Sequence, residues 1–206
     1  MNTATIQIIG GGGHAKVAIS TAEAAGIGIA AVFDDDASKH GRDIIGYRIA
    51  GPIPSAASWS GSTTGALIAI GDGKARQSIA KRCPARWQSL IHPTARVHAS
   101  ARIGVGTLIC AGAVVQPDAV IGDHVIVNTG VVVEHDCEVG DFVHIAPMAC
   151  LTGGCILGEG AFIGAGAVVA SASRVGNWVT VGAGSVVLRE VPDGLTVIGV
   201  PAKPLP

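Results

Sequence analysis

A repeat of six residues runs through the C-terminal half of the chain and constrains its fold more than any other feature. An aliphatic residue recurs at every sixth position from Ile91 to Val187, seventeen times in succession and without an insertion. Four residues after each of them, from Ala95 to Val191, the chain has only Ala, Ser, Thr, Cys or Val. A period of six is neither helical nor the simple alternation of a strand, and it indicates a repeat architecture.

Within each unit, the small residue and the aliphatic residue two positions later point to the same side of a short strand. The other residues turn a corner, where we expect glycine to relieve backbone strain. Glycine directly follows the aliphatic residue at Gly104, Gly122, Gly140, Gly158, Gly164, Gly176 and Gly182. Three successive units make one triangular coil. The repeat therefore predicts a parallel β-helix of between five and six coils over residues 91–192.

Residues 1–90 follow a different pattern, in which short apolar strands alternate with helices. We expect strands at 5–10, 27–33 and 66–70, helices at 15–25 and 74–82, and a loop that contains Pro52 and Pro54. This order predicts a small Rossmann-like βαβαβ domain, with a parallel sheet whose ligands bind at the C-terminal ends of the strands. Residues 193–206 form a C-terminal tail.

Composition excludes several classes of function. The 206 residues include 14 Lys and Arg against 15 Asp and Glu, and this balance excludes the basic surface typical of nucleic-acid binding. No apolar run is long enough to cross a membrane as a helix, and the N-terminus lacks the features of a signal peptide, so we expect a soluble cytoplasmic protein with no membrane partner. Five cysteines without a CxxC motif argue against a disulfide framework.

The first strand runs into four glycines at 10–13, immediately before the first expected helix. Gly10, Gly12 and Ala15 match a dinucleotide-binding pattern, and Asp34 follows at the expected distance. Some 88 residues provide only one half of the paired unit that holds NAD, however, so we do not expect an NAD-dependent oxidoreductase. The loop either offers backbone N–H groups to an anionic or polar ligand or is simply a tight turn.

The histidines do not predict a metal site. No two of His92, His98, His124, His135 and His144 are separated by one whole coil, whereas zinc needs three or four converging ligands. Two cysteines, by contrast, do have this separation of three repeats. Cys137 and Cys155 both occupy the small-residue position, and we expect them to stack as buried core thiols.

His135 is the candidate general base. It stands two places after Val133, at a corner, with Asp136 beside it and Gly153 one coil later. A neighbouring carboxylate can orient a histidine ring and raise its basicity. A backbone N–H of Gly153 could stabilise the oxyanion that forms during acyl transfer. The alternative is a solvated corner histidine without a catalytic role.

Several segments together resemble one known family. These are G-G-G-G-H-A-K (10–16), the Asp-rich end of the second strand, N-T-G-V-V-V-E-H-D-C-E-V-G (128–140), His144 and G-V-P-A-K-P (199–204). They resemble the bacterial acetyl-CoA-dependent acetyltransferases of nucleotide-activated amino sugars, which include UDP-4-amino-sugar and GDP-perosamine N-acetyltransferases. Sialic acid O-acetyltransferases are close relatives. The resemblance covers essentially the whole chain and implies that the β-helix is left-handed.

The resemblance implies transfer of an acetyl group from acetyl-CoA to a sugar amine, at C4 by family analogy, through direct attack and without a metal. It makes His135 the general base and Asp136 its assistant, in a homotrimer that binds acetyl-CoA between neighbouring β-helices. The residues implied in acetyl-CoA binding are His144, Gly153, Ala165, Gly199 and Lys203. Those implied in binding the nucleotide sugar are Gly11, Gly12, Gly13, His14, Asp34, Asp35, Gly71 and Asn128.

Two alternatives remain open. One is a sugar O-acetyltransferase of the sialic acid type, in which a hydroxyl group is the acceptor. The other is a trimeric scaffold or nucleotide-sugar sensor without catalysis, which would require none of His135, Asp136 and Gly153 because the repeat alone holds the coils together. The sequence does not distinguish between uridine, thymidine and guanosine as the base of the nucleotide.

Overall fold

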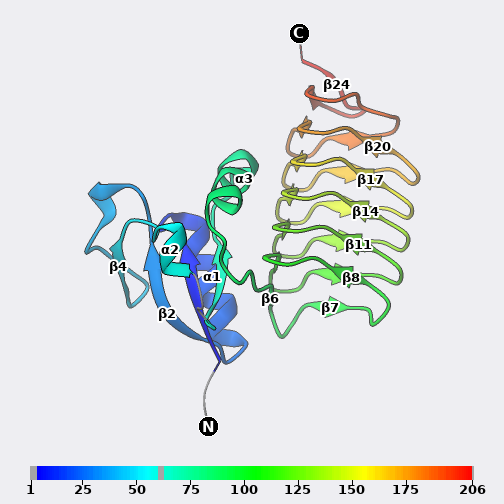
Figure 1. Cartoon of the computed structure of the whole chain (residues 1–206). Coiled ribbons are helices and arrows are strands. Elements are labelled where there is room, and N and C mark those ends of the chain that lie inside the picture. Colours follow the sequence, from blue (N-terminus) through cyan, green and yellow to red (C-terminus); the bar gives the residue numbers. More distant parts are fainter. Residues whose placement is uncertain (1–3, 60–62, 206) are drawn as a thin grey trace.

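The computed structural model describes residues 4–59 and 63–205, and it consists of an α/β domain beside a regular stack of short strands (Figure 1). The first domain contains β1 (Thr5–Ile9), α1 (Gly13–Ala24), β2 (Gly28–Phe33), a 3-10 helix η1 (Ala37–Lys39), β3 (Asp43–Ile44), β4 (Tyr47–Gly51), α2 (Ala56–Trp59), β5 (Gly65–Ile68) and α3 (Gly73–Arg82). The sheet order is β3-β4-β2-β1-β5, and every pair is parallel except the hairpin of β3 and β4. The expected strands and helices are present with small shifts at their ends.

The expected loop with Pro52 and Pro54 is present, but between β2 and β5 the chain also forms β3, β4 and two short helices that were not predicted. Ile45 and Gly46, both with positive φ, make the two-residue turn between β3 and β4. A β-branched residue is uncommon in such a turn, and β3 has only two residues, so no local pattern predicts the hairpin. The hairpin extends the sheet at the edge beyond β2.

The second domain begins with seventeen two-residue strands that recur every six residues. They are β6 (Leu90–Ile91), β7 (Arg96–Val97), β8 (Arg102–Ile103), β9 (Leu108–Ile109), β10 (Val114–Val115), β11 (Val120–Ile121), β12 (Ile126–Val127), β13 (Val132–Val133), β14 (Glu138–Val139), β15 (His144–Ile145), β16 (Cys150–Leu151), β17 (Ile156–Leu157), β18 (Phe162–Ile163), β19 (Val168–Val169), β20 (Arg174–Val175), β21 (Thr180–Val181) and β22 (Val186–Val187). Each pairs in parallel with the strand one coil away, as Val132 does with Val114 and Cys150.

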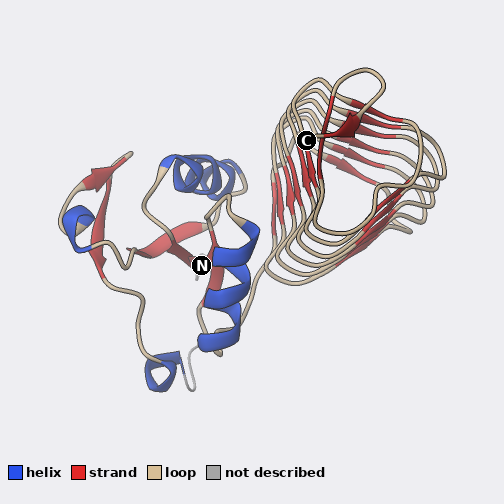
Figure 2. Ribbon diagram, turned by 90° about the horizontal axis from the view of Figure 1, so that it is seen from above, coloured by secondary structure: helices blue, strands red, loops and turns tan. Residues whose placement is uncertain are grey.

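These strands build the three faces of a triangular coil, which Figure 2 shows from above. Face 1 contains β6, β9, β12, β15, β18 and β21; face 2 contains β7, β10, β13, β16, β19 and β22; face 3 contains β8, β11, β14, β17 and β20. The tail strand β23 (Thr196–Ile198) joins face 1 beside β21, and β24 (Lys203–Pro204) pairs with β23 in the antiparallel direction. The small and aliphatic positions fill the interior: Val131 and Val133, for example, are fully buried.

The corners contain glycines of two kinds, with two different roles. From residue 106 to residue 184, the residue with positive φ stands three places after the aliphatic residue at every corner, and it is glycine at only seven of fourteen corners. The glycines directly after the aliphatic residue do not have positive φ. A Cβ on Gly104 would lie 2.4 Å from the backbone carbon of Gly122 on the next coil. These glycines are therefore required for close approach between coils, whereas the expected relief of corner strain comes from the seven glycines with positive φ.

The α/β domain packs on face 1. Ile8 and Ile19 share a core with Leu90 and Leu108, which belong to β6 and β9. Within residues 4–59 and 63–205, no helix is both long and apolar enough to cross a membrane.

Candidate functional site

The corner between faces 2 and 3 carries the histidine–carboxylate pair. His135 and Asp136 follow β13, and the Nδ1 atom of His135 lies 2.8 Å from Oδ2 of Asp136. Both side chains are largely exposed, at 61% and 67%. Because an ionised carboxylate only accepts hydrogen bonds, Nδ1 carries the proton and Nε2 keeps a free lone pair. The hydrogen bond from His135 to Asp136 raises the pKa of the histidine, which makes Nε2 a stronger base.

Gly153 lies directly beside this histidine on the next coil. A Cβ on Gly153 would come within 2.6 Å of Cε1 and 2.7 Å of Nε2 of His135, so only glycine leaves room for the ring in this position. The carbonyl of His135 also accepts a hydrogen bond from the N–H of Gly154 at 2.9 Å. The spacing of one coil thus places a backbone peptide next to the basic nitrogen.

A second group of predicted residues lies on face 1, where the two domains meet. His144 is on β15, and its Nδ1 donates to the carbonyl of Gly71 in the loop after β5, at 3.0 Å. Its Nε2 accepts from the side-chain amide of Asn128 at 3.2 Å, and the amide oxygen of Asn128 in turn accepts from the N–H of Thr129. Burial lowers the pKa of His144 to about 4, so the ring is neutral at pH 7 in a single tautomer.

Arg76 on α3 holds the two domains together at this point. It is only 1% exposed, and among the described residues its hydrogen-bond acceptors are all backbone carbonyls. The acceptors are Ile70 and Gly71 in the first domain and His124, Phe142 and Val143 in the β-helix. Because the same Gly71 carbonyl accepts from His144, Arg76 fixes the loop that orients this histidine. Sequence reasoning missed Arg76, since a basic residue on a polar helix gives no sign of burial.

The glycine loop lies at the C-terminal edge of the sheet, as predicted. Gly12 is the N-cap of α1 and has no side chain to cap the helix, and Gly12 and Gly13 have open space beside their Cα atoms. His14 follows in the first turn, and its ring centroid is 5.7 Å from that of His144. Its Nε2 is buried and has no hydrogen-bond partner within the described residues. Burial, with a contribution from Arg76, lowers the pKa of His14 to about 4.

The two predicted aspartates bind other parts of their own domain. Asp34 accepts hydrogen bonds from the N–H of Gly11 at 2.7 Å and from Lys39 at 2.9 Å, and so ties the glycine loop to the end of β2. Burial raises the pKa of Asp34, but the hydrogen bonds from Asp36, Lys39 and Gly11 outweigh it and hold the pKa below its usual value. Asp35 forms an exposed ion pair with Arg82.

A cavity of about 570 Å³ opens between the start of α3 and face 1. Its walls include Gly71, Lys74, His144, Phe162, Trp178 and Thr180. The ammonium group of Lys74 lies 5.8 Å from the ring centroid of Trp178. The cavity adjoins the His144 network and, apart from Gly71 and His144, none of these lining residues was predicted from the sequence.

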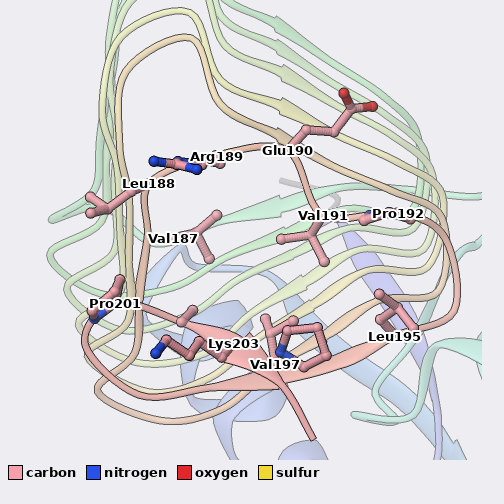
Figure 3. Close-up of a pocket in the computed structure, with 12 residues that line it drawn as sticks. Val187, Leu188, Arg189, Glu190, Val191, Pro192, Leu195, Val197, Pro201 and Lys203 are labelled. Carbon is pink, nitrogen blue, oxygen red and sulfur yellow. The ribbon is translucent and has the colours of Figure 1, made fainter.

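The remaining predicted residues lie on higher coils and in the tail. Ala165 is exposed at a corner between faces 1 and 2, two residues after β18. Gly199 follows β23, and Lys203 is on β24. Lys203 lines a cavity of about 380 Å³ at the capped end of the β-helix, together with Val187, Val191, Leu195 and Val197 (Figure 3). In the part of the chain that the structure describes, no group of three or more His, Cys, Asp and Glu could hold a metal ion.

The structure brings the predicted residues together in two groups and not in one. His135, Asp136 and Gly153 lie at the corner between faces 2 and 3, which is the corner opposite face 1. His14, Gly71, Asn128 and His144 lie at face 1, against the α/β domain. Within one chain, therefore, the basic nitrogen and the glycine loop are on different sides of the β-helix.

Comparisons with known proteins fit this architecture. The family model described as PglD N-terminal domain matches residues 5–83, and the model described as bacterial transferase hexapeptide (six repeats) matches residues 118–153 and 154–189. A comparison with curated protein sequences found no match.

Among solved structures, a histidine variant of perosamine N-acetyltransferase from Caulobacter crescentus, in complex with CoA and GDP-perosamine, is 37% identical with a TM-score of 0.91, over 100% of this chain and 98% of that chain. The acetyltransferase domain of PglB from Neisseria gonorrhoeae, in complex with acetyl coenzyme A, is 37% identical with a TM-score of 0.89, over 99% of this chain and 100% of that chain. WeeI from Acinetobacter baumannii is 26% identical with a TM-score of 0.80, over 98% and 100%. These matches confirm the predicted fold class, an α/β domain followed by a left-handed β-helix of hexapeptide repeats.

Proposed function

Because this chain belongs to the family of bacterial acetyltransferases that act on nucleotide-activated amino sugars, we propose that it transfers the acetyl group of acetyl-CoA to the amine of such a sugar. The relatives from Caulobacter crescentus and Neisseria gonorrhoeae bind CoA with GDP-perosamine and acetyl coenzyme A, respectively. The observation that carries the proposal for this chain is the His135–Asp136 pair with Gly153 beside its basic nitrogen.

In the proposed reaction, the amine nitrogen of the sugar attacks the thioester carbonyl carbon directly. A C–N bond forms, and the electron pair of the carbonyl moves to oxygen, where the N–H of Gly153 can stabilise it. Nε2 of His135 accepts the proton that the amine loses, while Asp136 holds the ring in the tautomer that leaves Nε2 free. The oxyanion then collapses, the C–S bond breaks, and CoA leaves as a thiolate that takes up a proton.

The glycine loop supplies the site that we propose for the nucleotide. Uncapped N–H groups at Gly12 and Gly13 and the positive end of the α1 dipole suit the diphosphate of a nucleotide sugar. His14 lies between the glycine loop and face 1, with its ring centroid 5.7 Å from that of His144. Asp34 supports the loop from behind through Gly11.

A homotrimer would complete the site. The basic nitrogen and the glycine loop lie on different sides of one β-helix, so a second copy must bring its corner between faces 2 and 3 to face 1 of the first. A closed ring of three copies forms three such sites, each between two subunits. The cleft between two β-helices would also exclude water from acetyl-CoA, which an isolated corner cannot do. Asn128 and the neutral ring of His144, both on face 1 of the first copy, would then lie opposite His135 of the second copy and face the acetyl group.

The proposal is tested by incubating the protein with acetyl-CoA and a panel of GDP-, UDP- and dTDP-linked amino sugars, beginning with 4-amino sugars, and analysing the products by mass spectrometry. We expect acetylation of an amine in at least one of them. A parallel reaction contains sialic acid, whose acceptor is a hydroxyl group. Acetylation of the hydroxyl sugar without reaction at any amine would overturn the assignment, and failure to bind acetyl-CoA at millimolar concentration would favour a scaffold.

A further inference from the structure

Face 2 of the β-helix has an uncharged stripe on its outer surface. In the strands of this face from β10 to β22, the second residue is buried inside the coil, and the first points outward and is half-buried. The first strand of the face, β7, has the charged Arg96 at the outward position. An apolar strip that continues over successive coils on a protein surface is typical of an interface. The outward residues of the stripe are Val114, Val132, Cys150, Val168 and Val186.

The other two faces do not offer such a surface. Face 3 has outward charges on every second coil, at Arg102, Glu138 and Arg174. The lower part of face 1 is covered by the α/β domain, which buries Leu90 and Leu108 and lies beside one side of the triangular coil (Figure 2). Because the cores of protein interfaces are depleted of charged residues, face 2 is the surface best suited to contact another chain.

The positions of the predicted site residues indicate which chain covers face 2. His135 lies where face 2 passes into face 3, directly after β13. Asn128 lies at the opposite edge, where face 1 passes into face 2 directly after β12. The two halves of the proposed site therefore flank face 2, and one chain cannot join them. A second copy of the same chain supplies the missing half.

The closure of a ring of three copies restricts the arrangement further. In such a ring, both neighbours of a subunit lie on the side that is turned toward the threefold axis. The corner of His135 borders faces 2 and 3, and face 1 also borders these two faces. A contact between this corner and face 1 of the next copy therefore requires that either face 2 or face 3 looks toward the axis.

The corner between faces 3 and 1 is already occupied by α3. Gln77 of this helix donates a hydrogen bond to the carboxylate of Glu159 at this corner. Arg76 donates to the carbonyl of Phe142, one coil below. The corner between faces 1 and 2 is open, by contrast, and Met148 is 68% exposed there. A neighbour must therefore approach face 1 across this open corner, which turns face 2 toward the axis.

We propose that three copies of this chain assemble through face 2, with the apolar stripe at the threefold axis, and that this contact brings His135 of one copy to His144 of the next. The inference rests on the proposed function, to which it adds the surface that builds the site. Burial of the valine side chains in the contact removes apolar surface from water and stabilises the ring. Met148 then packs against the neighbouring subunit, and Cys150 of each copy lies near the same residue of the others.

The test places one charge on each face in turn. Val168→Glu introduces a carboxylate into the stripe of face 2, and Ile156→Glu introduces the same group at a half-buried outward position of face 3. In analytical ultracentrifugation, we expect trimers of the original protein and of Ile156→Glu. Val168→Glu should sediment as a monomer, because a carboxylate is costly to bury in an apolar contact. A trimer of Val168→Glu, or equal dissociation of both variants, would overturn the inference.

Cys150 allows a second measurement on the original protein, which decides the inference even if Val168→Glu does not fold. A flexible bismaleimide should link subunits through Cys150, since the other four cysteines are buried. Linked subunits on a denaturing gel that are absent from Cys150→Ala support the proposed contact. A native trimer that gives no linked subunits contradicts it.

Neither measurement needs a substrate, so the inference and the proposed function can fail separately. If face 2 forms the trimer but no sugar is acetylated, the proposed function fails and the inference holds. If both hold, Val168→Glu should lose about 10²-fold or more in kcat/KM, because its separated subunits contain no complete site. If a sugar amine is acetylated and monomeric Val168→Glu is fully active, the inference fails and the proposed function holds.

Discussion

Two inactive variants of this protein should restore each other's activity when they assemble together. In His135→Ala the corner between faces 2 and 3 loses its base, and kcat should fall about 10²- to 10⁴-fold. In His144→Ala, face 1 loses the ring that links Gly71 to Asn128, and we expect this variant to lose most of its activity too, because the residues proposed to face the acetyl group are no longer held in place. Because these two groups lie on different sides of one chain, a mixed trimer contains a site in which both are intact.

The expected size of the recovery follows from the proposed ring of three subunits. Every mixed trimer, whether it has one or two copies of His135→Ala, contains one interface at which an intact corner meets an intact face 1. Mixed trimers should therefore have about one third of the original activity. A random mixture of equal amounts should have about one quarter, since a quarter of its trimers contain a single variant only. Both values lie far above the activity of either variant alone.

The assay co-expresses the two variants with different affinity tags and purifies the trimers on both tags in succession. The control carries His135→Ala on both tagged chains, and it should remain inactive because no intact corner is present. Activity of the doubly purified His135→Ala and His144→Ala trimers no higher than that of the single variants would refute the reasoning. A monomer that is active in analytical ultracentrifugation fractions would refute it equally.

Four further predictions concern single residues. Asp136 raises the pKa of His135, so Asp136→Asn should lower it. Because catalysis needs the neutral ring, the acid limb of the kcat–pH profile should then move to lower pH, and an unmoved limb would contradict this role. The loss of kcat in His135→Ala should shrink between pH 7 and pH 9, as the amine arrives deprotonated more often, and a constant loss in steady-state kinetics would indicate positioning instead of base catalysis. Gly153→Ala should displace the His135 ring and lower kcat while the Tm stays nearly constant, because the added Cβ meets the ring within 2.7 Å; full activity would show that the ring position is unimportant. Arg76→Met should lower the free energy of unfolding, measured by urea denaturation, by about 3 kcal/mol or more, because it leaves buried carbonyls without donors. A change below about 1 kcal/mol would contradict the role of Arg76 in joining the two domains.

The repeat made it possible to predict the β-helix and to predict which residues lie side by side on adjacent coils. A strict spacing of three repeats placed Gly153 beside His135 and stacked Cys137 on Cys155, because parallel coils pair in register. The contacts of His144 could not be derived in this way. Its carbonyl partner, Gly71, belongs to the other domain, and the docking of two domains depends on shape and burial that no local period encodes.

Arg76 is the clearest example of a residue whose role could not be predicted from the sequence. Its place on a polar helix is typical of a solvated side chain, yet five backbone carbonyls surround it. Every residue has a backbone carbonyl, so the sequence does not show which carbonyls accept hydrogen bonds from a buried arginine. Such an arginine therefore cannot be recognised from its neighbours in the sequence.

Because the coils pair in a uniform register, the number of coils fixes the distance between two points along the β-helix. The His135 corner and the tail at Gly199 are separated by 64 residues, or between three and four coils, which corresponds to roughly 17 Å at about 4.8 Å per coil. Removing or adding one whole coil of three repeats between them would preserve every pairing and the shape of every corner, yet it would move the tail by one rung relative to the base. If acetyl-CoA lies along the coils, with its thioester at His135 and its other end at Gly199 as the resemblance implies, a variant with one coil more or fewer should bind it more weakly, because the two contact points would no longer match the length of the molecule.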